Sequence, residues 1–235
     1  MGKDVDIFGE AFRDFMAGRV DAFIGVAIDR TRQDDLPVAY FFREYGHMPE
    51  WERLVMDRCR GRVLDAGAGA GAHALELQKR GLEVTAIDTS PGAVQVIKQR
   101  GIEKAYCEDF FRFGQSGFDN ILFLMNGIGM AGNLDRLPSL LHRARGMLQP
   151  GGEVFLESTD LIYMYEQEDG SFLIPAGRHY YGEVSYRLTY KEKKAAAFPW
   201  LFVDPDNLMQ AASQTGFDTE ILWTGKSRNY IARLF

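Results

Sequence analysis

The segment from Gly61 to Ala93, GRVLDAGAGAGAHALELQKRGLEVTAIDTSPGA, constrains the fold of this chain more than any other. A short apolar run is followed by the alternating glycines of DAGAGAGA and then by a helical stretch that ends at Gly81. The same order returns in EVTAID and SPGAVQVIKQRG, where Ser90 is the predicted N-cap and Pro91 the first helical residue. Strand, glycine turn, helix and strand in this order predict a parallel sheet with helices on its faces.

The alternation of strands and helices continues to the C-terminus. Strands are predicted at KAYCEDF, FDNILFLMN and GGEVFLEST, and helices at DRLPSLLHRARGML and DPDNLMQAASQTG, the second of which is capped by Asp204. The closing runs FDTEILWT and NYIARLF are separated by a short turn and are expected to pair antiparallel.

Two regions lie outside this alternation. Apolar residues at helical spacing from Phe8 to about Asp29 predict one or two amphipathic helices, and a further helix is predicted from about Pro49 to Cys59. The stretch from about 160 to 198 is rich in tyrosine and favours irregular chain and hairpin strands. We therefore expect residues 1–60 to form an N-terminal helical extension and residues 61–235 the main domain, with 160–198 as an insertion on the substrate side.

Composition narrows the range of partners. The chain has 235 residues, 46% of them hydrophobic, and a formal net charge of −6. An acidic balance of this kind argues against a nucleic acid or an anionic membrane surface as the main partner, because either would need a basic face. Cys59 and Cys107 fit neither a disulfide framework nor a metal-ligand spacing, and the N-terminus has no apolar core of a signal or anchor. The expectation is a cytoplasmic protein with reduced thiols, no bound metal and no membrane segment.

The glycine turn is a candidate ligand site. Glycines let backbone N–H groups approach a ligand closely, and the following helix N-terminus adds partial positive charge. Asp65 ends the first strand, where it can reach an ammonium group or an ordered water. Gly67, Gly69 and Ala72 also satisfy G-x-G-x-x-A, and Asp88 follows about 20 residues later, where it can accept hydrogen bonds from ribose hydroxyls. These features indicate an adenosine ligand and leave NAD and S-adenosylmethionine both open.

The segments that follow favour the second ligand. Asp109 in CEDFF comes after the third strand, where a carboxylate beside the ring of Phe110 suits an adenine. With FDNILFLMNGIGM, MLQPGGEVFLES and the closing antiparallel pair, the chain from Gly61 to Phe235 resembles the class I S-adenosylmethionine-dependent methyltransferases. The resemblance implies an α/β, doubly wound, Rossmann-like sheet of seven strands, mostly parallel with the last strand antiparallel. It also implies S-adenosyl-L-methionine as cofactor and S-adenosyl-L-homocysteine as product.

The resemblance also assigns candidate site residues, all toward the carboxyl ends of the strands. The cofactor-binding candidates are Asp65, Ala66, Gly67, Gly69, Gly71, Asp88, Thr89, Asp109, Phe110 and Asn126. Asn126, in LMNGIG, matches the strand end that faces the methyl group. MNGIG departs from the DPPY-like motif of adenine methyltransferases, which argues against DNA base methylation.

Acceptor and catalytic residues are less constrained. The N-terminal extension and the insertion are expected to form a lid over the methyl group, and Tyr40, Tyr45, Tyr163 and Tyr181 are candidate contacts to an aromatic or apolar small molecule. Packing of a hairpin is the competing explanation for these tyrosines. His73, Asn126 and His179 are the catalytic candidates, and Arg43 is expected in a surface ion pair.

The sequence thus predicts a methyltransferase with a small-molecule substrate. Two alternatives stay open, an NAD-dependent oxidoreductase and a non-catalytic module that binds S-adenosylmethionine.

Overall fold

A seven-stranded sheet is the central element of the computed structural model, which describes residues 5–29, 33–174 and 180–235. In spatial order its strands are β11 (Thr219–Thr224), β12 (Asn229–Leu234), β7 (Leu148–Thr159), β6 (Phe118–Phe123), β3 (Arg62–Ala66), β4 (Glu83–Asp88) and β5 (Lys104–Cys107). Strands β7, β6, β3, β4 and β5 pair in parallel, and β12 is antiparallel to both β7 and β11. The predicted sheet, mostly parallel with its last strand antiparallel, is confirmed.

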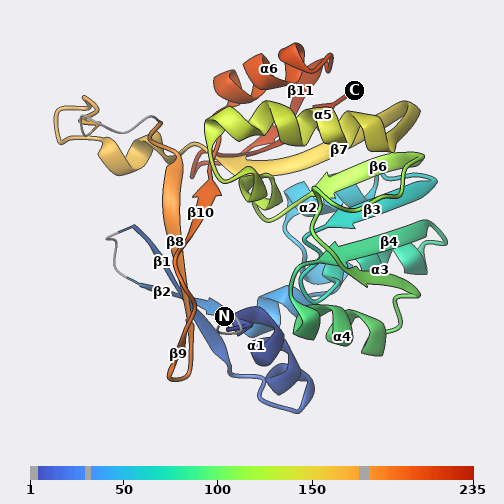
Figure 1. Cartoon of the computed structure of the whole chain (residues 1–235). Coiled ribbons are helices and arrows are strands. Elements are labelled where there is room, and N and C mark those ends of the chain that lie inside the picture. Colours follow the sequence, from blue (N-terminus) through green and yellow to red (C-terminus); the bar gives the residue numbers. More distant parts are fainter. Residues whose placement is uncertain (1–4, 30–32, 175–179) are drawn as a thin grey trace.

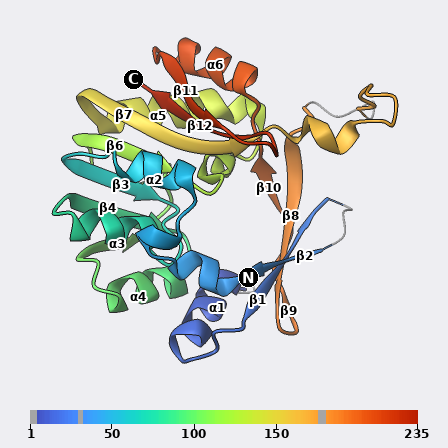
Figure 2. The ribbon, with the colours of Figure 1, turned by 180° about the vertical axis from the view of Figure 1, so that it is seen from behind.

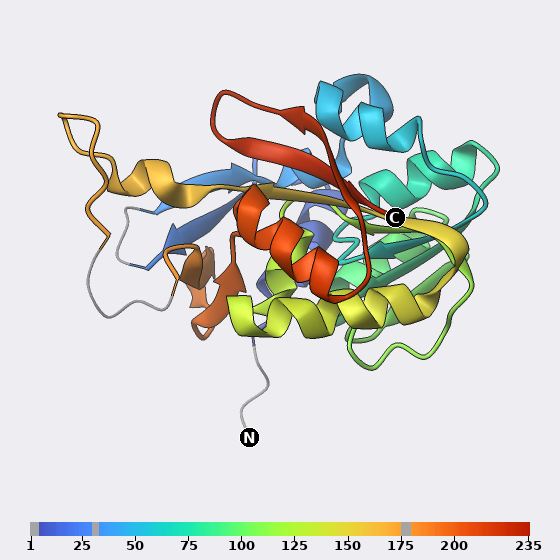
Figure 3. The same ribbon diagram turned by 90° about the horizontal axis from the view of Figure 1, so that it is seen from above.

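Helices cover both faces of this sheet. Leu64 and Ala66 of β3 pack with α5 (Leu137–Met147) and α6 (Pro205–Gln214), whereas Val63 packs with the opposite layer. The helices of that layer are α2 (Glu50–Met56), α3 (Ala72–Lys79) and α4 (Pro91–Gln99). Figure 3 shows α5 and α6 on one side of the sheet and α2 on the other. Successive side chains of a strand point to opposite faces, so one apolar strand supplies two cores.

The predicted helix starts are confirmed by their caps. Ser90 Oγ accepts a hydrogen bond from the Ala93 N–H at 2.9 Å, and Pro91 is the first residue of α4. Asp204 accepts from the N–H groups of Asp206 and Asn207, both at 3.0 Å, at the start of α6. Each cap satisfies N–H groups that have no partner within the helix.

The N-terminal region corrects one prediction. Helix α1 covers only Ile7–Met16, and the segment to Asp29 that was expected to be helical contains strand β1 (Phe23–Ile28). β1 pairs with β2 (Asp34–Pro37) and with β8 (Glu183–Tyr190), and β8 also pairs with β9 (Lys193–Lys194) and β10 (Phe198–Leu201). β2 is a local partner of β1, but β8 lies about 160 residues away in sequence, where no local periodicity can show the pairing.

The second sheet lies opposite the carboxyl ends of the parallel strands. Figures 1 and 2 show β8, β10, β1 and β2 standing beyond the arrowheads of β6, β3 and β4. Strands of the N-terminal extension and of the insertion thus form one sheet. In the part of the chain that the structure describes, short 3-10 helices connect the elements: η1 (Val38–Phe42), η2 (Tyr45–His47), η3 (Gly127–Ala131), η4 (Leu134–Arg136) and η5 (Leu161–Tyr165). Within the described ranges, no helix has both the length and the apolar character that a membrane crossing needs.

Helix α1 packs closely on α4 through two glycines and one shared carboxylate. A Cβ on Gly9 would lie 2.6 Å from the Gly92 Cα, so the contact requires glycine. Asp6 accepts hydrogen bonds from the Gly9 N–H at 2.8 Å, the Gly92 N–H at 2.9 Å and the Ser90 hydroxyl at 2.6 Å. One side chain therefore caps α1 and fixes it to the start of α4.

This contact predicts opposite effects for two glycine substitutions. Gly9→Ala should lower the free energy of unfolding by about 1–3 kcal/mol, because the added methyl overpacks the helix contact. Gly146→Ala, in α5 with open space around its Cβ, should raise it by up to about 1 kcal/mol through helix propensity. Urea unfolding measures both, and equal effects would contradict the assigned helix contact.

Candidate active site

A large cavity lies between the carboxyl ends of the parallel strands and the second sheet. Its volume is about 1490 Å³. One side is formed by the glycine turn and the ends of β4 and β5, and the other by β1, β2, β8 and β10. The predicted cofactor residues that line it are Asp65, Gly67, Gly69, Asp88, Thr89, Asp109 and Phe110. Ala66, Gly71 and Asn126 belong to the backbone around it without lining it.

The glycine turn is fixed to the end of β4 by backbone hydrogen bonds. Gly67, Gly69 and Gly71 have φ angles of +78°, +58° and +81°, a region that favours glycine. The N–H groups of Gly67 and Ala68 both donate to the Ile87 carbonyl, at 2.9 and 3.0 Å. The turn therefore has a defined conformation and is not a flexible spacer.

Asp88 connects the turn to the next helix. Its carboxylate accepts hydrogen bonds from the Gly69 N–H at 2.9 Å and from the Ser90 N–H at 2.8 Å. Burial raises the pKa of Asp88 to about 6, an effect that these two N–H groups oppose. A carboxylate has about four acceptor positions, so Asp88 keeps capacity to accept from hydroxyl groups in the cavity.

Asp65 is a buried carboxylate with an unused oxygen. It is 2% exposed, and within the described part of the chain its Oδ2 has no hydrogen-bond partner. Burial raises the pKa of Asp65, while the nearby His73 opposes this change. A cationic ligand group beside Oδ2 would remove the cost of leaving this oxygen unpaired.

Asp109 and Phe110 form the edge of the cavity next to β5. Asp109 Oδ1 accepts a hydrogen bond from the Phe111 N–H at 2.7 Å, which is the turn role that competed with a ligand role. Phe110 is buried and contacts Phe123 edge-on, with ring centroids 5.0 Å apart. Both side chains line the cavity, so the turn role and a ligand role are compatible.

A buried ionic network lies behind the turn. Arg43 is 7% exposed and Glu52 is 0% exposed, so the expected surface ion pair of Arg43 is wrong. The Arg43 Nε donates to Glu52 at 2.9 Å, a second guanidinium nitrogen contacts the other Glu52 oxygen, and His73 Nε2 lies 3.2 Å from both partners. Burial raises the pKa of Glu52, but His73 and Arg43 outweigh it and the net pKa is lowered.

The end of β6 is held in an uncommon backbone conformation. Met125 and Asn126 have φ angles of +52° and +57°, which non-glycine residues rarely adopt. The Met125 N–H donates to Glu157 at 2.8 Å, and the Asn126 side-chain amide donates to the Leu201 carbonyl at 3.1 Å. Asn126 therefore joins the main sheet to the second sheet. Burial, followed by the charge of Glu52, raises the pKa of Glu157 to about 7.

The four predicted substrate tyrosines do not line this cavity in the described structure. Tyr40, Tyr45 and Tyr181 donate their hydroxyls to Glu52, Asp57 and Asp160, at 3.4, 2.9 and 2.7 Å. Tyr163 is 47% exposed. The tyrosine that lines the cavity is Tyr186, on β8.

The two histidine candidates differ in what the structure says of them. His73 lines the cavity and belongs to the ionic network behind the turn. His179 lies outside the described residues.

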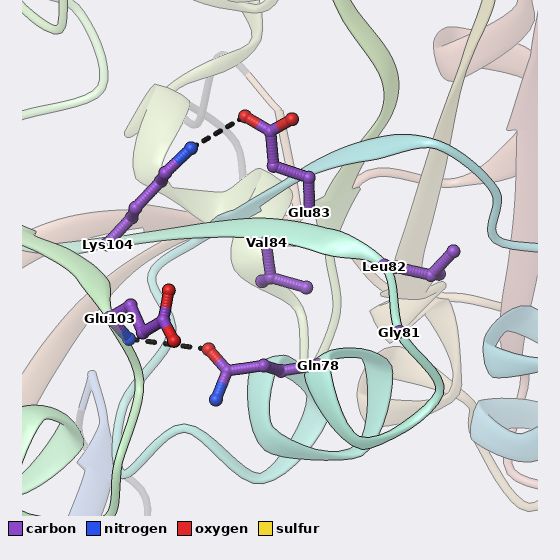
Figure 4. Close-up of a pocket in the computed structure, with 7 residues that line it drawn as sticks. All are labelled: Gln78, Gly81, Leu82, Glu83, Val84, Glu103 and Lys104. Carbon is purple, nitrogen blue, oxygen red and sulfur yellow. Dashed lines mark hydrogen bonds and ion pairs between the residues drawn. The ribbon is translucent and has the colours of Figure 1, made fainter.

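Figure 4 shows a second, smaller cavity of about 240 Å³ at the amino ends of β4 and β5. The Glu83–Lys104 ion pair, 2.7 Å long, and the bond from the Glu103 N–H to Gln78 lie at its edge. It is at the opposite end of the strands from the glycine turn. Its walls bring together neither a buried carboxylate nor an aromatic ring, so we place the candidate site in the large cavity. In the described ranges, no group of three or more His, Cys, Asp or Glu side chains is arranged to hold a metal ion.

Comparisons with known proteins bear on the family and the fold. A family described as "Methyltransferase domain" matches residues 63–152. The structure of an S-adenosylmethionine-dependent methyltransferase from Bacteroides fragilis, in complex with S-adenosyl-L-homocysteine, superimposes with a TM-score of 0.91 at 38% identity. That match covers 100% of this chain and 96% of the other.

Curated relatives match a shorter part. A ubiquinone biosynthesis O-methyltransferase of Xanthomonas oryzae pv. oryzae is 26% identical over 54% of this chain and 57% of its own length. A magnesium-protoporphyrin O-methyltransferase of Rhodobacter capsulatus is 44% identical over 20% of this chain and 21% of its own length. The chain thus spans about half the length of the first relative and a fifth of the second.

The buried network predicts a large loss of stability on removal of one charge. Glu52→Gln leaves the buried Arg43 without its carboxylate and should lower the free energy of unfolding by about 3–5 kcal/mol. The matched control is Glu83→Gln, which removes an exposed carboxylate paired with Lys104 and should change stability little. Urea unfolding compares the two, and equal small effects would show that the buried pair is not needed for stability.

Proposed function

The chain belongs to the class I S-adenosylmethionine-dependent methyltransferases, and we propose that it transfers the methyl group of S-adenosylmethionine to an oxygen of a small-molecule acceptor. The observation that carries this proposal is one cavity with the glycine turn on one side and the second sheet on the other. Such a cavity has room for a donor and an acceptor together. The names of the curated relatives, both O-methyltransferases, support oxygen as the methylated atom.

The lining residues fit the parts of the methyl donor. Asp65, with its unpaired buried oxygen, would hold the ammonium group, and Asp88 with Thr89 would hold the ribose hydroxyls. Asp109 and Phe110 would contact the adenine. Gly67 and Gly69, which line the cavity, would bring the backbone close to the ligand. Ala66, Gly71 and Asn126 do not line it, so they would support the lining residues from behind.

The chemistry asks the chain mainly to position two ligands. The bound donor supplies an activated methyl group: a C–O bond forms as the C–S bond breaks, its electron pair stays on sulfur, and the hydroxyl proton leaves to solvent. The chain's residues bind both molecules, align them and exclude water between them. His73 is held by Glu52 and Arg43, which supports a positioning role for this side chain rather than that of a free base.

The alternative functions have less support. An NAD-dependent oxidoreductase and a non-catalytic binding module were both compatible with the glycine turn alone. The Bacteroides fragilis methyltransferase, which matches along the whole of this chain and was solved with S-adenosyl-L-homocysteine, favours the methyl donor over a dinucleotide. The large cavity has one wall for the methyl donor (the donor site) and a second wall opposite it, which favours catalysis over binding alone. We also propose a cytoplasmic location, supported by the unpaired thiols of Cys59 and Cys107.

Ligand-dependent thermal stability tests the proposal. At a concentration 100 times its Kd, S-adenosyl-L-homocysteine should stabilise the protein by about 2.7 kcal/mol and raise Tm by roughly 5–10 °C. NAD should leave Tm unchanged. Stabilisation by NAD alone would overturn the proposal in favour of an oxidoreductase.

Asp65→Asn separates ligand binding from folding. The variant should be as stable as the parent, since a neutral amide costs less to bury than a carboxylate. Its affinity for S-adenosyl-L-homocysteine should fall at least about tenfold through loss of a charge-assisted contact. Calorimetric titration measures the affinity, with Asp135→Asn on the exposed side of η4 as control. An unchanged affinity would exclude Asp65 from the binding site of the methyl donor.

A further inference from the structure

The inner face of the second sheet is an aromatic wall of the cavity. Tyr186, Phe198 and Trp200 line the cavity, and their ring centroids lie 5.8 to 6.0 Å apart. Trp200 packs on Gly129, where an added Cβ would lie 2.2 Å from the indole nitrogen. The apolar side chains of Val26 and Leu188 extend the same wall. These rings offer flat apolar surfaces to a ligand on the side opposite the glycine turn.

One polar group on this wall is unused. Among the described residues, no protein group forms a hydrogen bond with the Tyr186 hydroxyl, and burial raises the pKa of Tyr186 to about 12. The neighbouring tyrosines Tyr180, Tyr181 and Tyr190 all donate their hydroxyls to carboxylates. The Tyr186 oxygen is not among the buried side-chain atoms that lack a partner, so solvent reaches it. A ligand that displaces this solvent must itself pair with the hydroxyl to avoid leaving it unsatisfied, which gives specificity.

Acidic side chains outnumber basic ones in the lining of the cavity. Its lining includes seven carboxylates against two guanidinium groups. The carboxylates are those of Asp6, Asp34, Asp35, Asp65, Asp88, Glu108 and Asp109. Of the two guanidinium groups, Arg43 is paired with Glu52, and Arg136 lies over the Phe111 ring at 5.1 Å on an exposed edge. This balance suits a cationic methyl donor and opposes an anionic acceptor.

We propose that the acceptor is a neutral, flat aromatic molecule with oxygen substituents, bound against Tyr186, Phe198 and Trp200 with the Tyr186 hydroxyl as its hydrogen-bond partner. The proposal rests on the proposed function, because the acceptor site is defined as the wall of the cavity opposite the donor site. Tyr186 is then a specificity-determining residue. An aliphatic diol would lose the ring contacts, and an aromatic carboxylate would meet the acidic lining.

Binding to the full chain saturated with S-adenosyl-L-homocysteine tests the proposal. The probes are catechol, its carboxylated form 3,4-dihydroxybenzoate, and cyclohexane-1,2-diol, measured by ligand-observed NMR titration. Catechol should bind at least about tenfold more tightly than either of the others. Tyr186→Phe should weaken catechol about fivefold to tenfold, the loss of one hydrogen bond. Tyr163→Phe, which removes an exposed hydroxyl outside the cavity, should change nothing.

The outcomes separate the two proposals. If S-adenosyl-L-homocysteine does not bind, the proposed function fails before any acceptor is tested. If it binds but catechol does not, or the carboxylate binds as well as catechol, the acceptor class is wrong and the donor site stands. If Tyr186→Phe and Tyr163→Phe behave alike, the role of Tyr186 is overturned. The affinity of each variant for S-adenosyl-L-homocysteine shows that a change at Tyr186 is not a loss of fold.

Discussion

The pairing of β1 with β8 is the interaction on which the cavity depends. It joins the N-terminal segment to the insertion in an antiparallel register that sets Gly25 opposite Thr189 and Val26 opposite Leu188. A Cβ on Gly25 would lie 2.2 Å from the Gln33 amide nitrogen and 2.3 Å from the Thr189 hydroxyl oxygen, so both side chains would have to move to admit a larger residue. Without the pair, β1 with β2 and β8 with β9 and β10 would be two separate groups of strands and not one sheet. The ladder therefore creates the second wall of the site.

The two walls of the cavity, the glycine turn and the second sheet, differ in the chemical groups that they offer to a ligand. The glycine turn offers backbone N–H groups and carboxylates, which suit a ligand with hydroxyls and positive charge. The second sheet offers aromatic rings, which suit a ligand held by shape and apolar area. Methyl transfer from a sulfonium needs alignment of two molecules more than it needs a strong acid or base, so walls of unlike character are sufficient for binding both in order.

Features set by neighbouring residues, such as helix caps, could be predicted from the sequence. Features set by contacts between residues far apart in the sequence could not. Ser90 and Asp204 cap helices within three residues of themselves, so sequence alone located both starts. Arg43 and His73 are 30 residues apart and meet only in the folded chain, so their network had no local signature. Tyr186 was missed for a related reason. The register of β8 against β1 decides which tyrosine of the insertion faces the cavity. Amino-acid composition gives no information on this register.

Two small contacts hold the second sheet at opposite ends. Helix α1, which packs against β1 and β8, is fixed to α4 by Asp6, and β10 is fixed to the end of β6 by the Asn126 amide. The second sheet is thus attached to the main sheet and its helices at two separate places. The distance between the glycine turn and the second sheet, and so the thickness of a ligand that fits between them, depends on both contacts.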